Sequence, residues 1–396
     1  MRILILGAGV IGLSTAYHLA RRRTGSITLI DKGFAGDGSS GRAAGIITGH
    51  LWTETGVRVR NRCLELYRDL SQTLPGYSFR RCGCLNLFEP ASWKLREPLL
   101  PLYEQLSAPY EVLNPREINT RWPAIHVPED WTGLFDPLGG YSEPDEYIRA
   151  LRTEVASLGA EVRESEIVTA LRLERGRVTG VQTAKSLLEA DVIISTVFAW
   201  TRALLANLGI TVPVKSFVHQ RYVSQPLSEP IDVPAVNANP NSVYFRPSRN
   251  GAILAGVETA ERQEYPVDAL EFDLSQIRTN GELRQRVRAS LAPLVPALSD
   301  LAWVSEKIGL ITFSMDGEPV VGPVEAIGGL FIAAGFHSGG FAYNPGIGEL
   351  LSEYVIFGRP QTANVDSWLP NRFDPDETSR YLERKIRQKD VVRRRH

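Results

Sequence analysis

The sequence Gly7-Ala8-Gly9-Val10-Ile11-Gly12 decides the fold of this 396-residue chain. The apolar run at residues 3–6 (ILIL) precedes it and predicts a strand that is buried on both faces. Apolar positions within residues 13–20 then predict one face of a helix. A second apolar run at residues 27–30 (ITLI) predicts another strand, which ends at Asp31. Together these segments predict a complete β-α-β unit.

Each glycine of the motif has a physical role. Gly7 permits the tight turn, Gly9 lets a pyrophosphate approach the backbone, and Gly12 lets the helix pack on the strand. The start of the helix supplies N–H donors and a positive dipole end to phosphates. Asp31 lies 19 residues after Gly12, where a carboxylate accepts from ribose hydroxyls and disfavours the 2′-phosphate of NADP. The motif therefore predicts FAD or NAD and does not separate the two.

Three further glycine-rich segments follow along the chain. Residues 36–47 (GDGSSGRAAGII) hold enough small residues for the backbone to press against a flat ligand, and Ser39 and Ser40 can donate to phosphate. Residues 316–323 (DGEPVVGP) form a loop. Residues 330–350 (LFIAAGFHSGGFAYNPGIGEL) read as a strand, a glycine turn and the start of a helix.

These segments resemble, in the same order, the motifs of the D-amino-acid oxidase superfamily of flavoenzymes, which includes glycine oxidase, sarcosine oxidase and dimethylglycine dehydrogenase. The resemblance spans residues 3 to about 373 and favours FAD over NAD. It implies an α/β architecture, in which an FAD-binding Rossmann-like domain of the glutathione-reductase type is interleaved with an α+β substrate domain built on an antiparallel sheet. An NAD-binding dehydrogenase would leave the C-terminal motifs unexplained.

The resemblance also implies a division of the chain. We expect the FAD-binding domain to use residues 1–80, 142–212 and 308–370, and the substrate domain residues 81–141 and 213–307. Residues 371–396 remain as a basic C-terminal helix or tail, in which residues 384–395 carry seven cations and one acid. We expect a solvated, frayed helix end there, with docking to an acidic partner or a lipid surface as the alternative.

The site residues follow from the same resemblance. The residues expected to bind FAD are Gly7, Gly9, Val10, Ile11, Gly12, Asp31, Lys32, Ser39, Ser40, Arg42, Ala43, Ala44, Gly45, Ile46, Val168, Thr196, Trp200, Asp316, Gly335, His337, Ser338, Gly339, Gly340 and Phe341. The polar residues that could face the flavin are His50, His219, His337, Tyr244 and Tyr343. Among these we select His337, Tyr244 and His50 as the catalytic candidates.

The sequence departs from its relatives where they hold the substrate carboxylate. The arginine or lysine of those relatives is replaced by apolar and small residues within residues 46–50, by Ile311-Thr312 and by Ala342. An unpaired carboxylate beside a flavin would be costly to desolvate. Either another cation takes this role, or the substrate is not a free glycine- or sarcosine-like acid. The candidate replacements are Arg246, Arg221 and Arg58, although a solvated surface position is the simpler interpretation of each.

The function that this pattern favours is FAD-dependent oxidation of an amine or amino-acid-like substrate. Hydride would pass from the α-carbon to flavin N5, and water would hydrolyse the resulting imine. Oxidation of a 2-hydroxy acid is an alternative, with His337 or His50 as the base it requires. An alternative of another class is a flavoprotein subunit of an electron-transfer complex with no catalysis of its own.

The electron acceptor is oxygen, a quinone or a protein. Sarcosine oxidase-like relatives activate oxygen with a lysine two residues before a glycine, and Leu254 stands at that position before Gly256. A fixed cation stabilises the superoxide that forms first, so its loss favours a dehydrogenase.

Composition excludes several other classes of partner. The chain has 44 basic and 45 acidic residues, which argues against a general nucleic-acid binder. No apolar run approaches the ~20 residues of a membrane-spanning helix, and the first residues lack a signal-peptide pattern. Cys63, Cys82 and Cys84 are then expected to be reduced thiols in a cytoplasm, with no metal-ligand set around them.

Noncovalent FAD is the first testable prediction. Relatives that attach FAD covalently use a His or Cys where this chain has Arg42 and Gly309. The purified protein should be yellow, and acid denaturation should release intact FAD into the supernatant, as measured by chromatography. Yellow colour that stays with the precipitated polypeptide would contradict this prediction.

Overall fold

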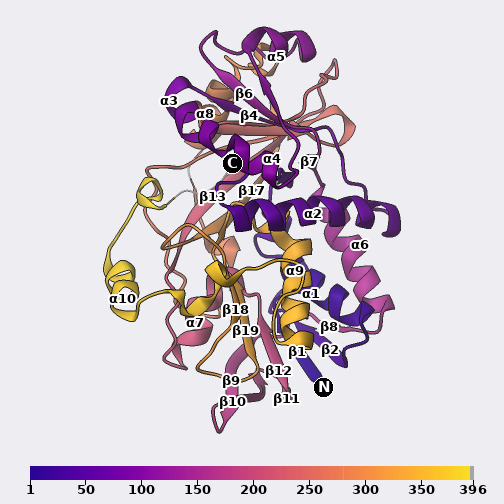
Figure 1. The fold of residues 1–396 in the computed structure, drawn as a ribbon, viewed down its shortest axis with the longest axis vertical. Coiled ribbons are helices and arrows are strands. Elements are labelled where there is room, and N and C mark those ends of the chain that lie inside the picture. The colour runs from indigo at the N-terminus through magenta and orange to yellow at the C-terminus, as the bar shows by residue number, and fades with distance from the viewer. Residues whose placement is uncertain (280, 393–396) are drawn as a thin grey trace.

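The computed structural model describes residues 1–279 and 281–392, which form two large β-sheets (Figure 1). In this part of the chain, one sheet has six strands. Its strands in spatial order are β18 (Val320–Pro323), β19 (Leu330–Ala334), β12 (Val192–Ser195), β1 (Arg2–Leu6), β2 (Ser26–Ile30) and β8 (Glu161–Arg163). All neighbours pair in parallel except β18 and β19. This is the sheet that the predicted β-α-β unit requires.

Strand β1 is buried on both faces, as its continuous apolar run predicts. Ile3 and Ile5 belong to one core cluster, and Leu4 and Leu6 belong to another. The helices α1 (Val10–Arg21), α6 (Pro144–Ser157) and α9 (Gly340–Phe357) build the first cluster, and α2 (Glu54–Thr73) packs against α9.

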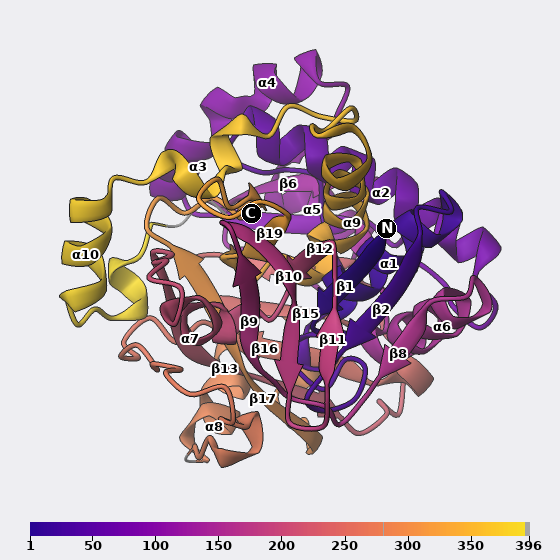
Figure 2. The ribbon, with the colours of Figure 1, turned by 90° about the horizontal axis from the view of Figure 1, so that it is seen from below.

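The opposite face of the six-stranded sheet is covered by a smaller sheet. Its strands are β9 (Val168–Glu174), β10 (Arg177–Thr183) and β11 (Leu187–Glu189), drawn in front of the larger sheet in Figure 2. The short helix α7 (Thr201–Ala206) completes this layer with Leu204 and Leu205. Helices on one face and a small antiparallel sheet on the other confirm the predicted α/β class.

The second large sheet has nine strands in the described residues and is mainly antiparallel. In spatial order they are β20 (Phe336–His337), β17 (Trp303–Ser314), β13 (Val214–Ser224), β16 (Ile253–Val257), β15 (Val243–Pro247), β14 (Ala235–Ala238), β4 (Cys84–Phe88), β6 (Thr132–Asp136) and β5 (Glu111–Leu113). The helices α5 (Pro115–Arg121) and α8 (Glu282–Leu291) pack on one face. The other strands and α-helices of the described residues are β3 (Ile46–Ile47), β7 (Gly140–Tyr141), α3 (Pro90–Arg96), α4 (Leu100–Gln105) and α10 (Pro375–Glu383).

The predicted domain boundary at residue 308 falls inside β17, and β20 joins the nine-stranded sheet from a segment expected in the other domain. The division into two domains therefore stays a prediction. No helix in residues 1–279 or 281–392 is both long and apolar enough to cross a bilayer. The three cysteines of the described chain are free, and Cys63 and Cys84 are buried.

The C-terminal segment differs from the expected frayed helix end. After α10, residues 384–392 pack against the nine-stranded sheet, while residues 393–396 lie outside the described part of the chain. Ile386 and Val391 join a core cluster with Phe217 and Phe313, and Thr259 Oγ1 donates to the buried Gln388 Oε1 at 2.6 Å.

Two cations of this segment form ion pairs with a carboxylate outside it. Arg387 and Lys389 each lie 3.0–3.1 Å from Glu261. The charge count alone suggested solvation, but the apolar residues between the cations face the sheet. That spacing was the signal available in the sequence.

Substitution of Ile386 tests this packing. Ile386→Ala should cost about 2–4 kcal/mol of stability, because it removes a buried aliphatic side chain and leaves a cavity. A matched control is Lys385→Ala, one residue away and exposed, which should change stability by less than ~0.5 kcal/mol. Thermal unfolding followed by near-UV circular dichroism measures both. Equal melting temperatures for the two variants would show that the segment is solvated.

Candidate active site

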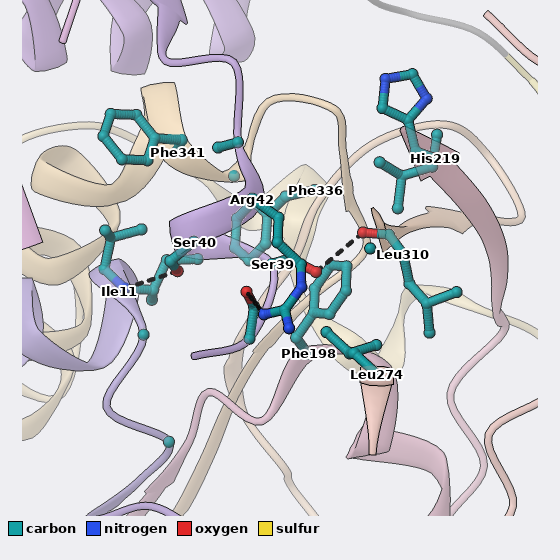
Figure 3. Close-up of a pocket in the computed structure, with 18 of the residues that line it drawn as sticks. Ile11, Ser39, Ser40, Arg42, Phe198, His219, Leu274, Leu310, Phe336 and Phe341 are labelled. Atoms are coloured by element: carbon teal, nitrogen blue, oxygen red, sulfur yellow. Dashed lines mark hydrogen bonds between the residues drawn. The ribbon is translucent and has the colours of Figure 1, made fainter. Parts of the chain in front are cut away.

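A cavity of about 470 Å³ lies between the two large sheets. Leu6, Ile30 and Thr196 line it at the carboxyl ends of β1, β2 and β12, where ligands bind in open α/β sheets. The nine-stranded sheet contributes His219 and Leu310, which Figure 3 shows on the side of the view away from Ile11 and Ser40. The cavity thus reaches from the glycine motif to the second sheet.

The glycine motif holds the start of α1 against this cavity. Gly7 adopts a φ of +95°, a conformation that favours glycine. A Cβ atom at Gly12 would lie 1.9 Å from the Gly7 carbonyl oxygen, so the close packing of helix on strand requires glycine there. The Val10 N–H donates to Ser40 Oγ at 3.0 Å. This hydrogen bond ties residues 36–47, the small-residue loop, to the start of the helix.

Asp31 follows β2 and joins two loops. Its Oδ2 accepts from the Ala8 N–H at 2.7 Å, and its Oδ1 accepts from the Gly33 N–H at 2.8 Å. Burial raises the pKa of the Asp31 carboxyl, against the effect of these two hydrogen bonds. A carboxylate has about four acceptor positions, so two remain for ribose hydroxyls in the cavity.

Most of the residues expected to bind FAD line this single cavity. They are Gly7, Gly9, Val10, Ile11, Asp31, Lys32, Ser39, Ser40, Arg42, Ala43, Ala44, Gly45, Ile46, Val168, Thr196, Trp200, His337, Ser338, Gly340 and Phe341. Segments that are more than 300 residues apart in the sequence meet here. Their convergence supports the predicted FAD contacts, which stay a prediction.

The other expected FAD residues lie outside the cavity lining and shape its surroundings. Gly12 packs the helix on the strand, and Gly335, with a φ of +70°, turns the chain between β19 and β20. Asp316 accepts from Arg372 Nε at 2.8 Å in the turn after β17. Gly339 immediately precedes α9. Direct FAD contact stays a prediction for these four residues.

The catalytic candidate His50 also lies outside the cavity lining. It is 1% exposed, stacks on Tyr103 with ring centroids 4.9 Å apart, and has its Nε2 3.0 Å from the Pro109 carbonyl oxygen. Burial lowers the pKa of His50. The chain turns away from the cavity after β3, which the sequence did not reveal. Tyr343 likewise packs outside the cavity lining.

The other catalytic candidates, His337 and Tyr244, do line the cavity. His219 joins them: its Nε2 lies 2.9 Å from the Tyr244 hydroxyl, and the two rings stack with centroids 5.7 Å apart. His219 lies on β13 and Tyr244 lies on β15, and β16 runs between these two strands. A Cβ atom at Gly256 on β16 would lie 2.2 Å from the Tyr244 hydroxyl oxygen. Glycine at this position is therefore what allows the His219–Tyr244 contact.

Burial raises the pKa of Tyr244, so its hydroxyl stays protonated at neutral pH. Sequence reasoning named both residues but did not pair them. The available signal was a glycine inside a strand pattern, which marks close approach of another group.

Two of the three candidate arginines are buried, which contradicts the expected surface positions. Arg246 forms a two-fold ion pair with Glu143 at 2.9 and 3.0 Å, and its Nε donates to the Ala44 carbonyl at 2.6 Å. Arg221 Nε donates to the Arg42 carbonyl at 3.1 Å. Neither lines the cavity. Both hold the backbone of the small-residue loop, and Arg58 is exposed on α2 and pairs with Glu54.

A glycine-rich helix start and a carboxylate at the ends of parallel strands form the kind of site that binds a nucleotide cofactor. Residues 2–354 match the family model described as FAD dependent oxidoreductase, and the chain belongs to that family. FAD is therefore its cofactor. The residues fit it: the cavity offers a glycine-rich helix start, a partly buried carboxylate with free acceptor positions and small residues along its wall.

Individual relatives match most of the chain at moderate identity. The chain is 29% identical over 91% of its length to 4-methylaminobutanoate oxidase (formaldehyde-forming) of Paenarthrobacter nicotinovorans, and it spans 44% of that longer protein. It is 26% identical to sarcosine oxidase subunit beta of Rhodobacter capsulatus, with 90% of the chain and 85% of the relative covered. The structure of L-proline dehydrogenase from P. horikoshii superposes with a TM-score of 0.86 at 26% identity, over 94% of this chain and 97% of the other.

Removal of the Asp31 carboxylate should weaken FAD binding. Asp31→Ala deletes a charged acceptor worth ~1.5–3 kcal/mol, so we expect roughly ten- to hundredfold weaker affinity for FAD. Fluorescence titration of the apoprotein with FAD measures this. Glu174→Ala, an exposed carboxylate at the end of β9, is the control and should not change the affinity. Unaltered affinity in Asp31→Ala would remove Asp31 from the cofactor site.

Proposed function

We propose that the protein oxidises an amine or amino-acid-like substrate, with FAD bound in the cavity as hydride acceptor. The names of the three relatives support this, since each describes an oxidase or dehydrogenase of an N-methylated or cyclic amino acid. The observation that carries the proposal is the His219–Tyr244 pair, which places a proton acceptor and a hydroxyl together on the cavity wall.

The chemistry requires the substrate nitrogen to be neutral. An ammonium group has no lone pair to stabilise the cation that develops as hydride leaves the neighbouring carbon. Bound FAD would supply the acceptor for that hydride, and water would hydrolyse the imine product. His219 can take the ammonium proton beforehand, either directly or through the Tyr244 hydroxyl. Tyr244 then keeps a hydrogen bond to the amine and orients its α-carbon.

His337 is the second polar group proposed for substrate or flavin contact. It lines the cavity at a φ of +56°, unusual for a residue other than glycine, and its ring packs on Phe313 with centroids 5.0 Å apart. Such a conformation is often held at functional sites. For a 2-hydroxy acid, the alternative substrate, His337 would serve as the base.

The electron acceptor stays a proposal as well. By the family resemblance, Leu254 corresponds to the oxygen-activating lysine; it is buried and lies outside the cavity lining. The absence of a cation at this position favours a quinone, dye or protein acceptor over oxygen. The relative named as a subunit supports the alternative of a flavoprotein that works within a larger complex.

Anaerobic reduction of the bound flavin tests the proposal. A panel of secondary amines, N-methyl amino acids, primary amino acids and 2-hydroxy acids should contain an amine that bleaches the flavin absorbance. His219→Asn should slow this reduction by about 10²-fold or more at pH 7, the usual contribution of a positioned proton acceptor. The defect should shrink as pH approaches the substrate's own pKa, because solvent then supplies the neutral amine.

The controls separate the roles of the residues. Gly256→Ala should give a similar loss because its methyl group displaces Tyr244 from His219. The exposed His126→Gln should leave the rate unchanged. Flavin that is reduced only by 2-hydroxy acids would replace the proposal by the alternative substrate class, and full activity of His219→Asn at pH 7 would exclude the His219 role.

A further inference from the structure

Arg60 is a buried basic residue of α2 that lies directly behind the start of α9. It is 2% exposed, and its Cζ lies 4.0 Å from the ring centroid of Tyr343. Its Nη1 donates to the Thr48 carbonyl at 3.3 Å. A Cβ atom at Gly339 would lie only 2.8 Å from Nη2, so the guanidinium fills the space that a side chain at this position would need.

Among the ion pairs of the described residues, Arg60 has no acidic partner, whereas two other buried cations do. Arg246 pairs with Glu143, and Lys215 pairs with Glu264. The ion pairs of the described chain include none for Arg60, and its buried Nε has no hydrogen-bond acceptor among the described residues. Burying a cation without a counter-ion is costly. An anion nearby would offset that cost.

The surroundings add more positive potential at the same place. Helix α9 spans Gly340–Phe357, and its N-terminus carries the positive end of the helix dipole. A cation beside that end is unfavourable by itself. Ser338, Gly340 and Phe341, on either side of Gly339, line the FAD cavity. Two sources of positive potential therefore meet at this wall, where an anionic ligand would stabilise both.

We propose that Arg60 is a positioning residue that stabilises negative charge on the reduced flavin from behind Gly339. Two-electron reduction of a flavin places negative charge near N1 and O2 of the ring. Arg60 would act through space together with the start of α9, and so raise the reduction potential of the bound FAD. This inference rests on the FAD placement described under the proposed function and adds a residue that tunes the cofactor.

Sulfite binding by the FAD-loaded protein tests the inference without substrate turnover. The sulfur lone pair of sulfite forms a bond to N5 of the oxidised flavin, and the adduct carries the added negative charge in the N1–O2 region. Arg60→Met should weaken sulfite binding by at least tenfold. Its two-electron midpoint potential should fall by about 30 mV or more, the equivalent of a tenfold change. Arg60→Lys should recover most of both quantities.

Arg58→Met is the matched control, since Arg58 lies on the same helix but is exposed and paired with Glu54. It should bind sulfite as wild type does. Should Arg60→Met fail to fold, Arg60→Gln carries the same measurement, because glutamine keeps a donor for the Thr48 carbonyl.

The outcomes also separate this inference from the proposed function. Sulfite affinity and potential equal to wild type in a FAD-loaded Arg60→Met or Arg60→Gln variant would overturn the role of Arg60, whatever substrate the enzyme oxidises. If no amine reduces the wild-type flavin but Arg60→Met still weakens sulfite binding, the role of Arg60 is supported and the proposed amine substrate is overturned.

Discussion

The carboxylate of Asp31 is the constraint on which the rest of the site depends. It accepts from Ala8 after β1 and from Gly33 after β2, and so fixes the two turns relative to each other. The first turn sets the start of α1, whose Val10 N–H binds Ser40. The second leads into the small-residue loop. Hydrogen bonds from the Gly36 N–H to the Ala8 carbonyl at 3.0 Å and from the Gly7 N–H to the Ile30 carbonyl at 2.8 Å reinforce the same junction.

The small-residue loop is then held from the opposite sheet by buried side chains. Arg221 and Arg246, on β13 and β15, donate to carbonyls of Arg42 and Ala44. The hydroxyl of Ser39 donates to the Leu310 carbonyl of β17 at 2.9 Å. These contacts couple the two sheets across the cavity. Arg221 and Arg246 therefore hold the backbone of the loop and do not line the cavity.

The nucleotide end was predictable from the sequence because its rules are local. The glycine spacing, the apolar runs and Asp31 lie within 31 residues and each has a direct steric or electrostatic reason. The part of the cavity near His219 and Tyr244 was not predictable, because its geometry depends on which strands pair in the nine-stranded sheet. His219 and Tyr244 meet only because Gly256 lies between them on β16. The chain turns after β3, so His50 stacks on Tyr103 outside the cavity lining. The burial of Ile386 was not predicted, because the cations beside it in the sequence indicated a solvated segment.

The central claim is that one cavity holds FAD from Asp31 to the start of α9, with the reacting face toward His219 and Tyr244. A crystal structure of the flavin-loaded protein tests it most directly. The account predicts ribose oxygens within hydrogen-bond distance of the Asp31 carboxylate, and the flavin ring against residues 43–46 and 337–340 with its N5 open to the His219–Tyr244 pair. A flavin bound elsewhere, or a ring whose N5 is closed off from that pair, would contradict it.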